Sequence, residues 1–140
     1  MMGICIRQHI YIWYSAQIFA DLYAAATGFK LKGEDLKQRS MKAWNLHKAI
    51  NVREGQITRD RFPHVWYSPL KGVNGESIYT MDYFGKKILK PEDLEMMLDD
   101  YYRERGWDVK TGIPTKKKLE ELGLEDIAAD LENKGIYTCG

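Results

Sequence analysis

Apolar side chains recur at three- and four-residue steps in the first part of the chain, which predicts two amphipathic helices. We expect the first helix from about Tyr11 to Ala26, with Gly28 as its stop. One face carries Tyr11, Tyr14, Ile18, Leu22 and Ala25, and the opposite face carries Ile12, Phe19, Tyr23 and Ala26. Because both faces are apolar, other structure is expected to cover most of this helix.

The second helix is expected from about Glu34 to Ile50, because Glu34 and Asp35 suit the positive end of a helix dipole. Its predicted core stripe is Leu36, Ala43, Leu46 and Ile50, with Trp44 alongside. The basic side chains that we expect to face water are Lys37, Arg39, Lys42 and Lys48.

From residue 51 to residue 90 the helical periodicity lapses, and glycines and prolines punctuate the chain. The Asn74-Gly75 dipeptide favours one short hairpin between residues 67–73 and 76–83. A long irregular connection of this kind is usually functional or lies against another surface.

Three helices are predicted in the last part of the chain. The first begins at Pro91, ends at Gly106 and has a core stripe of Leu94, Met97, Leu98 and Tyr101. Thr115 is the expected N-cap of a helix over 116–122 that Gly123 ends, and the last helix runs over about 125–134, buries Ile127, Ala128 and Leu131, and stops at Gly135. The sequence therefore predicts a single domain over residues 1–140, mostly α, with several helices, a loop-rich centre and at most one short β-hairpin.

Composition and charge exclude several classes of function. The chain has 140 residues, 21 Lys and Arg against 20 Asp and Glu, and a net charge of +1, so no bulk charge attracts nucleic acid or an anionic membrane. The longest apolar stretch, residues 10–26, is interrupted by polar residues and is too short to span a membrane. Cys5 and Cys139 lie at opposite ends of the chain, which fits a reducing, cytoplasmic compartment.

No self-contained active site is visible in the sequence. The three histidines, His9, His47 and His64, lack partners at metal-ligand spacing, and packing or solvent roles explain them better. The acid pairs at 99–100 and 120–121 are expected to be solvated faces, and no nucleophile elbow or glycine-rich phosphate loop occurs. Taken alone, Cys5 would be interpreted as an inert small hydrophobe. The many aromatic residues suit packing or a protein interface.

Several segments together resemble the C-terminal domain of the tungsten-containing aldehyde ferredoxin oxidoreductase family. The segments are Gly3-Ile4-Cys5, Ala26-Thr27-Gly28, Trp44-Asn45-Leu46, residues 51–55 (NVREG), residues 98–108 (LDDYYRERGWD), residues 112–115 (GIPT) and residues 118–124 (KLEELGL). They occur in the order of the family and with similar spacing over nearly the whole chain.

The resemblance implies a cofactor role for the first few residues. Enzymes of this family oxidise aldehydes at a tungsten or molybdenum held by two pterins, and they pass electrons through a [4Fe-4S] cluster to ferredoxin. One cluster ligand comes from a motif of the form Asp-x-x-Gly-Leu-Cys. Gly3 and Ile4 match its glycine and leucine, beside the pterin, and Cys5 matches the cysteine that binds the cluster. A thiolate suits iron–sulfur ligation.

The departures from the family pattern lead to two hypotheses. The aspartate of the motif falls one position before Met1, the other three cluster cysteines are absent, and Cys139 matches no family ligand. The first hypothesis is that the chain is a C-terminal fragment or subunit of such an enzyme and is inactive alone. It would bind the cluster and tungstopterin, or molybdopterin, only together with the upstream catalytic portion. The alternative is a stand-alone helical protein-interaction module without a cofactor. The oligomeric state stays open.

Overall fold

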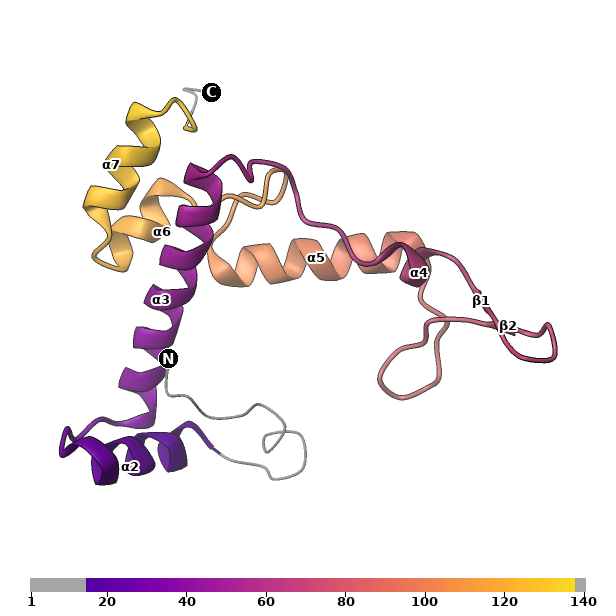
Figure 1. Ribbon diagram of the computed structural model, residues 1–140, viewed down its shortest axis with the longest axis horizontal. Coiled ribbons are helices and arrows are strands. Elements are labelled where there is room, and N and C mark those ends of the chain that lie inside the picture. Colours follow the sequence, from indigo (N-terminus) through magenta and orange to yellow (C-terminus); the bar gives the residue numbers. More distant parts are fainter. Residues whose placement is uncertain (1–14, 138–140) are drawn as a thin grey trace.

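Helices make up nearly all of the regular structure in residues 15–137, the part of the chain that the computed structural model describes (Figure 1). The helices are α2 (Ala16–Thr27), α3 (Gly33–Arg53), α4 (His64–Tyr67), α5 (Pro91–Arg105), α6 (Lys116–Glu121) and α7 (Glu125–Asn133). One antiparallel sheet pairs β1 (Leu70–Lys71) with β2 (Ser77–Ile78). The predicted mostly-α class with a loop-rich centre and at most one short β-hairpin is confirmed. Residues 80–89 form a second, hairpin-like turn that contains one isolated β-bridge and no strand.

The helix ends follow the local signals in the sequence. The Ser15 side chain accepts a hydrogen bond from the Ile18 amide at the start of α2, and the Thr115 hydroxyl accepts one from the Lys118 amide at the start of α6. Gly106 ends α5 in the left-handed region with φ of 72°, a conformation that glycine adopts without strain. The predicted helical residues 11–14 lie outside the described part of the chain.

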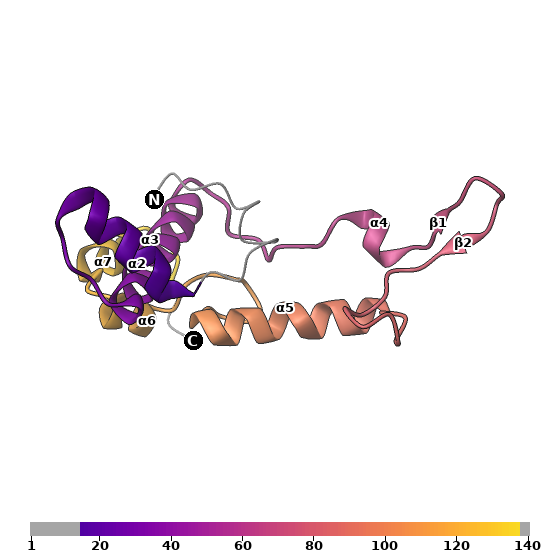
Figure 2. The same cartoon turned by 90° about the horizontal axis from the view of Figure 1, so that it is seen from below.

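The main hydrophobic core lies between the C-terminal half of α3 and the pair α6 and α7. Its fully buried members come from these helices and the loops beside them: Ala49, Val52, Leu119, Ala128 and Leu131. The views in Figures 1 and 2 show α6 and α7 gathered at this end of α3, whereas α5 points away from it. We call α2, α3, α6 and α7 the helical body.

The buried face of α3 differs from the predicted stripe. Asn45, Lys48, Ala49 and Val52 are buried, whereas Ala43, Trp44 and Ile50 are exposed and Leu46 is only half-buried. Lys48, which we expected in water, is 8% exposed. The prediction of the face was wrong because α7 and the Trp107 loop pack on the side that carries these polar residues, and no described element covers the Ile50 side to a comparable degree.

The prediction that other structure covers most of α2 was also wrong for the residues described. Only Phe19 and Ala20 are buried, and Ile18 and Leu22 are exposed. The helix lies across the N-terminal end of α3 (Figure 1). A Cβ atom at Gly33 would lie 2.7 Å from the Gln17 amide nitrogen, so this crossing requires a residue without a side chain.

A second, smaller cluster lies where α5 meets the body. Leu98, Tyr102 and Trp107 are buried in it, with Phe62 and Tyr101 partly buried against them. Leu94 is also buried, but Met97 of the predicted stripe is exposed, because Tyr102 instead completes the covered face.

The chain between α3 and α5 forms a long arm. No residue from Arg53 to Asp93 is buried, although the segment contains exposed apolar side chains along its length. The arm runs along α5, passes through α4 and projects beyond the N-terminal end of α5 (Figures 1 and 2). The α7 side of the molecule and the arm therefore lie at opposite ends. No helix in the described residues is long and apolar enough to cross a membrane.

We predict that Leu119→Ala destabilises the body by about 2–5 kcal/mol, because the fully buried side chain leaves a cavity in the main core. Urea denaturation followed by circular dichroism measures the change. The control is Leu70→Ala in the exposed strand β1, for which we expect about 0.5 kcal/mol or less. Equal losses in the two variants would contradict this division of the core.

Candidate functional site

The predicted cofactor residues Gly3, Ile4 and Cys5 lie outside the described part of the chain, so their roles stay predictions. Residues 15–137 contain no group of three or more His, Cys, Asp or Glu side chains able to hold a metal ion. His47 stacks on Trp44 with ring centroids 6.0 Å apart, and His64 begins α4. The described residues therefore do not by themselves fit a metal or an iron–sulfur cluster.

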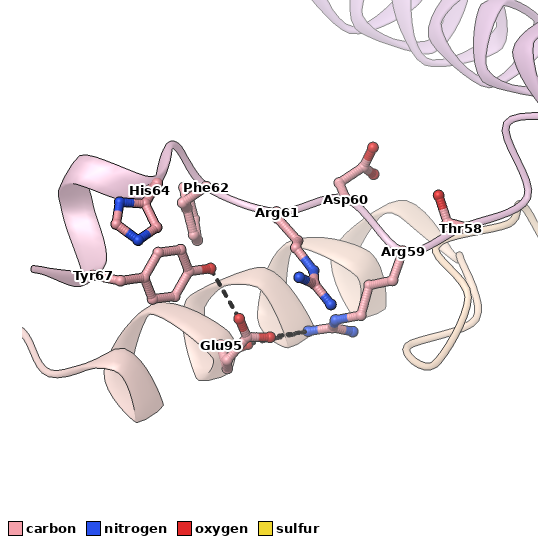
Figure 3. Close-up of a pocket in the computed structure, with 8 residues that line it drawn as sticks. All are labelled: Thr58, Arg59, Asp60, Arg61, Phe62, His64, Tyr67 and Glu95. Carbon is pink, nitrogen blue, oxygen red and sulfur yellow. Dashed lines mark hydrogen bonds and ion pairs between the residues drawn. The ribbon is translucent and has the colours of Figure 1, made fainter.

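A cluster of polar and aromatic side chains lies where the arm leaves the body. We call it the junction; its residues are Asn45, Lys48, Arg59, Asp60, Tyr102 and Trp107. It joins α3, the first part of the arm, α5 and the loop that follows α5. An open groove of about 820 Å³ borders it, lined by arm residues and by Glu95 (Figure 3).

Asn45 and Trp107 form the buried end of the junction. The indole nitrogen of Trp107 donates a hydrogen bond of 2.8 Å to Oδ1 of Asn45, and the side-chain nitrogen of Asn45 donates to the Met41 carbonyl. Both side chains are buried, so each satisfies a polar group that would otherwise lose its hydrogen bond with water. Lys48 lies over the indole, with Nζ 5.2 Å from the ring centroid.

Asp60 connects the arm to both long helices. Its Oδ2 accepts a hydrogen bond from Lys48 of α3 at 2.9 Å and another from the Tyr102 hydroxyl of α5 at 2.7 Å. The same hydroxyl accepts a bond of 3.0 Å from the Asp60 amide. Burial alone would raise the pKa of Asp60, but the bonds from Lys48 and Tyr102 outweigh it, so the pKa is lowered. Burial, and then the bond to Asp60, raise the pKa of Tyr102, so its hydroxyl keeps its proton.

Arg59 points the other way, toward α5 (Figure 3). Its Nη2 lies 2.7 Å from Oδ1 of Asp99 and 3.3 Å from Oε2 of Glu95, and its Nη1 donates to the Val109 carbonyl. The guanidinium also lies over the Tyr102 ring. Burial lowers the pKa of Arg59, yet the two carboxylates raise it overall, so the cation is permanent.

Three of the residues that line the groove, Arg59, Glu95 and Tyr67, are joined by hydrogen bonds. Glu95 binds Arg59 and also accepts a hydrogen bond of 2.9 Å from the Tyr67 hydroxyl (Figure 3). Burial and the Glu95 bond raise the pKa of Tyr67, which disfavours its ionisation. Each carboxylate named here has a cationic or hydroxyl donor, so these pairs hold the arm against α5.

Sequence reasoning missed most of the junction. It treated Lys48 as a solvated residue and Asp99 as part of a solvated acid pair, and it did not single out Arg59 or Asp60. A signal was present in the Arg-Gly-Trp-Asp run at 105–108, which contributes Trp107, and in the spacing of Asn45, Lys48 and Val52, which places them on one helix face. This face of α3 was missed because Asn45 and Lys48 are polar, and the prediction counted only apolar side chains as buried.

Several known proteins are similar to this chain over most of its length. The family model described as aldehyde ferredoxin oxidoreductase, domains 2 & 3, matches residues 1–124. The tungsten-containing aldehyde ferredoxin oxidoreductase of Pyrococcus abyssi is 29% identical over 115 residues, which are 79% of this chain and 17% of the relative. That of Pyrococcus horikoshii is 27% identical over 128 residues, 89% of this chain and 18% of the relative.

A solved structure has the same fold. It is the active site complex BamBC of benzoyl coenzyme A reductase in complex with 1,5-dienoyl-CoA, and one of its chains is similar with a TM-score of 0.60 and 27% identity. The similarity covers 91% of this chain and 16% of that chain. The chain thus spans less than a fifth of the length of each of these relatives.

We predict that Trp107→Phe costs about 1–3 kcal/mol of stability, because it removes the indole donor and leaves Oδ1 of buried Asn45 without it. The free energy of unfolding in urea measures this. Trp66→Phe is the matched control, since Trp66 is 43% exposed and lies in the arm, and it should change stability by about 0.5 kcal/mol or less. A Trp107 variant as stable as the control would refute the importance of the buried bond.

The lowered pKa of Asp60 predicts a dependence of stability on pH. Because the folded state favours the charged carboxylate, its contribution is present above the ordinary carboxyl pKa of 3.8 and is lost as the pH falls through the lower folded value. Asp60→Asn should therefore be less stable than the wild type near neutral pH, and the difference should shrink below about pH 4. Urea unfolding at several pH values tests this, with exposed Glu120→Gln as a control; a difference that grows on acidification would contradict it.

Proposed function

Because the chain belongs to the aldehyde ferredoxin oxidoreductase family, we propose that it is the C-terminal module of a tungsten- or molybdenum-pterin enzyme of this type. The observation that carries the proposal is the family match over residues 1–124, which includes the Gly3-Ile4-Cys5 segment. The module acts with an upstream catalytic portion, the part of the enzyme that precedes the matched segment, and the isolated chain is inactive. The tungsten named in the Pyrococcus relatives supports a tungstopterin in the complete enzyme.

The proposed reaction converts an aldehyde and water to a carboxylate, three protons and two electrons. In the complete enzyme, a pterin-bound metal would supply the oxidation, and a [4Fe-4S] cluster would carry the electrons to ferredoxin. Within this chain, Cys5 would provide one thiolate ligand to that cluster, and Gly3 and Ile4 would contact the pterin. Thiolates are the usual cluster ligands, and backbone amides beside them tune the potential.

The described residues fit a supporting role in this enzyme. In the junction, Lys48 is paired with Asp60, and Arg59 is paired with Asp99 of α5, so these charged groups hold the arm against the two long helices. A module that holds its own body and arm in a fixed relation, while the reacting groups come from elsewhere, agrees with a chain that spans 16–18% of its relatives. The cytoplasm is the proposed compartment, on the grounds of the cysteine usage.

The alternative is a helical interaction module that binds a protein partner without any cofactor. The many exposed apolar side chains of the arm favour an interface of some kind and agree with either function. The two functions differ in whether Cys5 holds iron in the assembled complex.

We predict that Cys5→Ser, in a complex assembled with the upstream portion, loses most of the cluster, because serine is a poor ligand for iron in this setting. The measurements are iron per complex, the electron paramagnetic resonance signal of the reduced cluster and aldehyde oxidation. Cys139→Ser is the matched control and should retain all three. If Cys5→Ser keeps its iron and activity, the ligand assignment is wrong. If the wild-type complex binds its partner but holds neither iron nor tungsten, the cofactor-free module is the correct function.

A further inference from the structure

The distal end of the arm consists of the β1–β2 hairpin, which projects beyond α5, and a second hairpin-like turn at residues 80–89, which lies beside the N-terminal end of α5 (Figures 1 and 2). The first pairs Leu70 with Ile78 and Lys71 with Ser77. Its turn is closed by bonds from the Gly72 amide to the Glu76 carbonyl and from the Gly75 amide to the Gly72 carbonyl, at 2.9 and 3.0 Å. Val73 lies at its tip and is fully exposed.

The second hairpin runs from Thr80 to Leu89. Its ends are joined by bonds from the Leu89 amide to the Thr80 carbonyl and from the Asp82 amide to the Lys87 carbonyl, both 2.8 Å. The Asp82 carboxylate accepts bonds from the amides of Lys86 and Lys87 at 2.7 and 3.1 Å, which fixes the turn. The conformation of the tip is thus set by the hairpin itself.

This second tip presents two aromatic rings to the solvent. Tyr83 is 92% exposed and Phe84 is 74% exposed, and the rings meet edge to face with centroids 5.3 Å apart. Large aromatic side chains on a rigid turn are typical anchors of protein interfaces. Because the turn is already ordered, binding would cost little additional conformational entropy.

We propose that the two hairpin tips, Val73 and the pair Tyr83 and Phe84, are preformed anchors that insert into apolar pockets of the upstream catalytic portion of the enzyme. This docking proposal rests on the proposed function, since it takes its partner from there. The chain spans 16–18% of its relatives, so the larger part of such an enzyme lies outside it and is available to cover the arm.

Three features of the arm favour this occupant. No residue from Arg53 to Asp93 is buried, so the apolar side chains of this segment are open to contact by a partner. The exposed apolar side chains extend along the arm from Ile57 through Trp66 to Ile88, which is typical of a surface that a protein partner covers. Residues 70–90 carry four lysines and two carboxylates, which predicts an acidic rim around the pockets of the partner.

The test is a binding measurement between the full chain and the upstream portion, produced as a separate polypeptide, by isothermal titration calorimetry. The double variant Tyr83→Ser/Phe84→Ser should weaken Kd by about tenfold or more, as loss of an aromatic anchor does. Its thermal unfolding should match that of the wild type, because both side chains are exposed. The matched control is Phe29→Ser/Ile50→Ser, which removes two exposed apolar side chains outside the arm and should leave Kd unchanged.

Hydrogen exchange provides a second measurement on the unaltered chain. On complex formation, amides in residues 72–75 and 83–86 should exchange more slowly. Unchanged Kd in the arm variant, equal weakening in the control, or protection confined to the helical body would each overturn the proposal. So would protection of the tips through self-association of the chain, or tip-dependent flotation with phosphatidylcholine–phosphatidylserine vesicles, because the occupant would then be a second copy or a membrane.

The two proposals can fail separately. If Cys5→Ser loses iron but the arm variant binds normally, the docking proposal fails and the enzymatic function stands. If the arm variant loses binding while the wild-type complex holds no cluster or tungsten, the docking surface is correct and the enzymatic function fails.

Discussion

The carboxylate of Asp60 is the point at which the helical body, the arm and α5 are joined. Lys48 of α3 and Tyr102 of α5 both donate to its Oδ2, so one oxygen joins the body to the helix that projects from it. These bonds keep Asp60 charged although burial opposes the charge. The adjacent Arg59 adds a connection to Asp99 on another part of α5. Ion pairs at the base of the arm, together with Phe62 packed against the second cluster, therefore hold the arm against α3 and α5.

This construction explains how a chain with so little core beyond the body can still present a defined shape. The main core ends near Val52, and the second cluster around Trp107 and Tyr102 is small. Beyond it the arm has only hairpin turns and a few side-chain bonds to α5. Such an arrangement is typical of a part of a larger assembly, where the missing apolar contacts come from a neighbouring portion. It agrees with membership of a family whose named relatives are about five times as long as this chain.

Local signals in the sequence predicted the elements well. Gly28 and Gly106 ended their helices, Thr115 capped α6 and Asn74-Gly75 turned the hairpin, because each acts through backbone geometry and bonds within a few residues. The faces of the helices were predicted less well. Choosing the covered side of α3 required knowing which neighbours pack there, and periodicity alone favoured Ile50, which is exposed, over Lys48, which is not.

The sequence by itself thus determined the class of fold, most of the helix ends and, through the motifs it shares with a family, the kind of enzyme to which the chain is related. It did not predict the last turn of α3, which ends at Arg53 and not at Ile50, or the short helix α4. Tertiary structure alone decided the junction, because Asn45, Lys48, Asp60 and Trp107 are polar or far apart along the chain and only folding brings them together. It also decided that Tyr83 and Phe84 are surface residues. Large aromatic side chains are often buried in a folded domain. Tyr83 and Phe84 are exposed because they lie in the arm, where the described residues form no hydrophobic core.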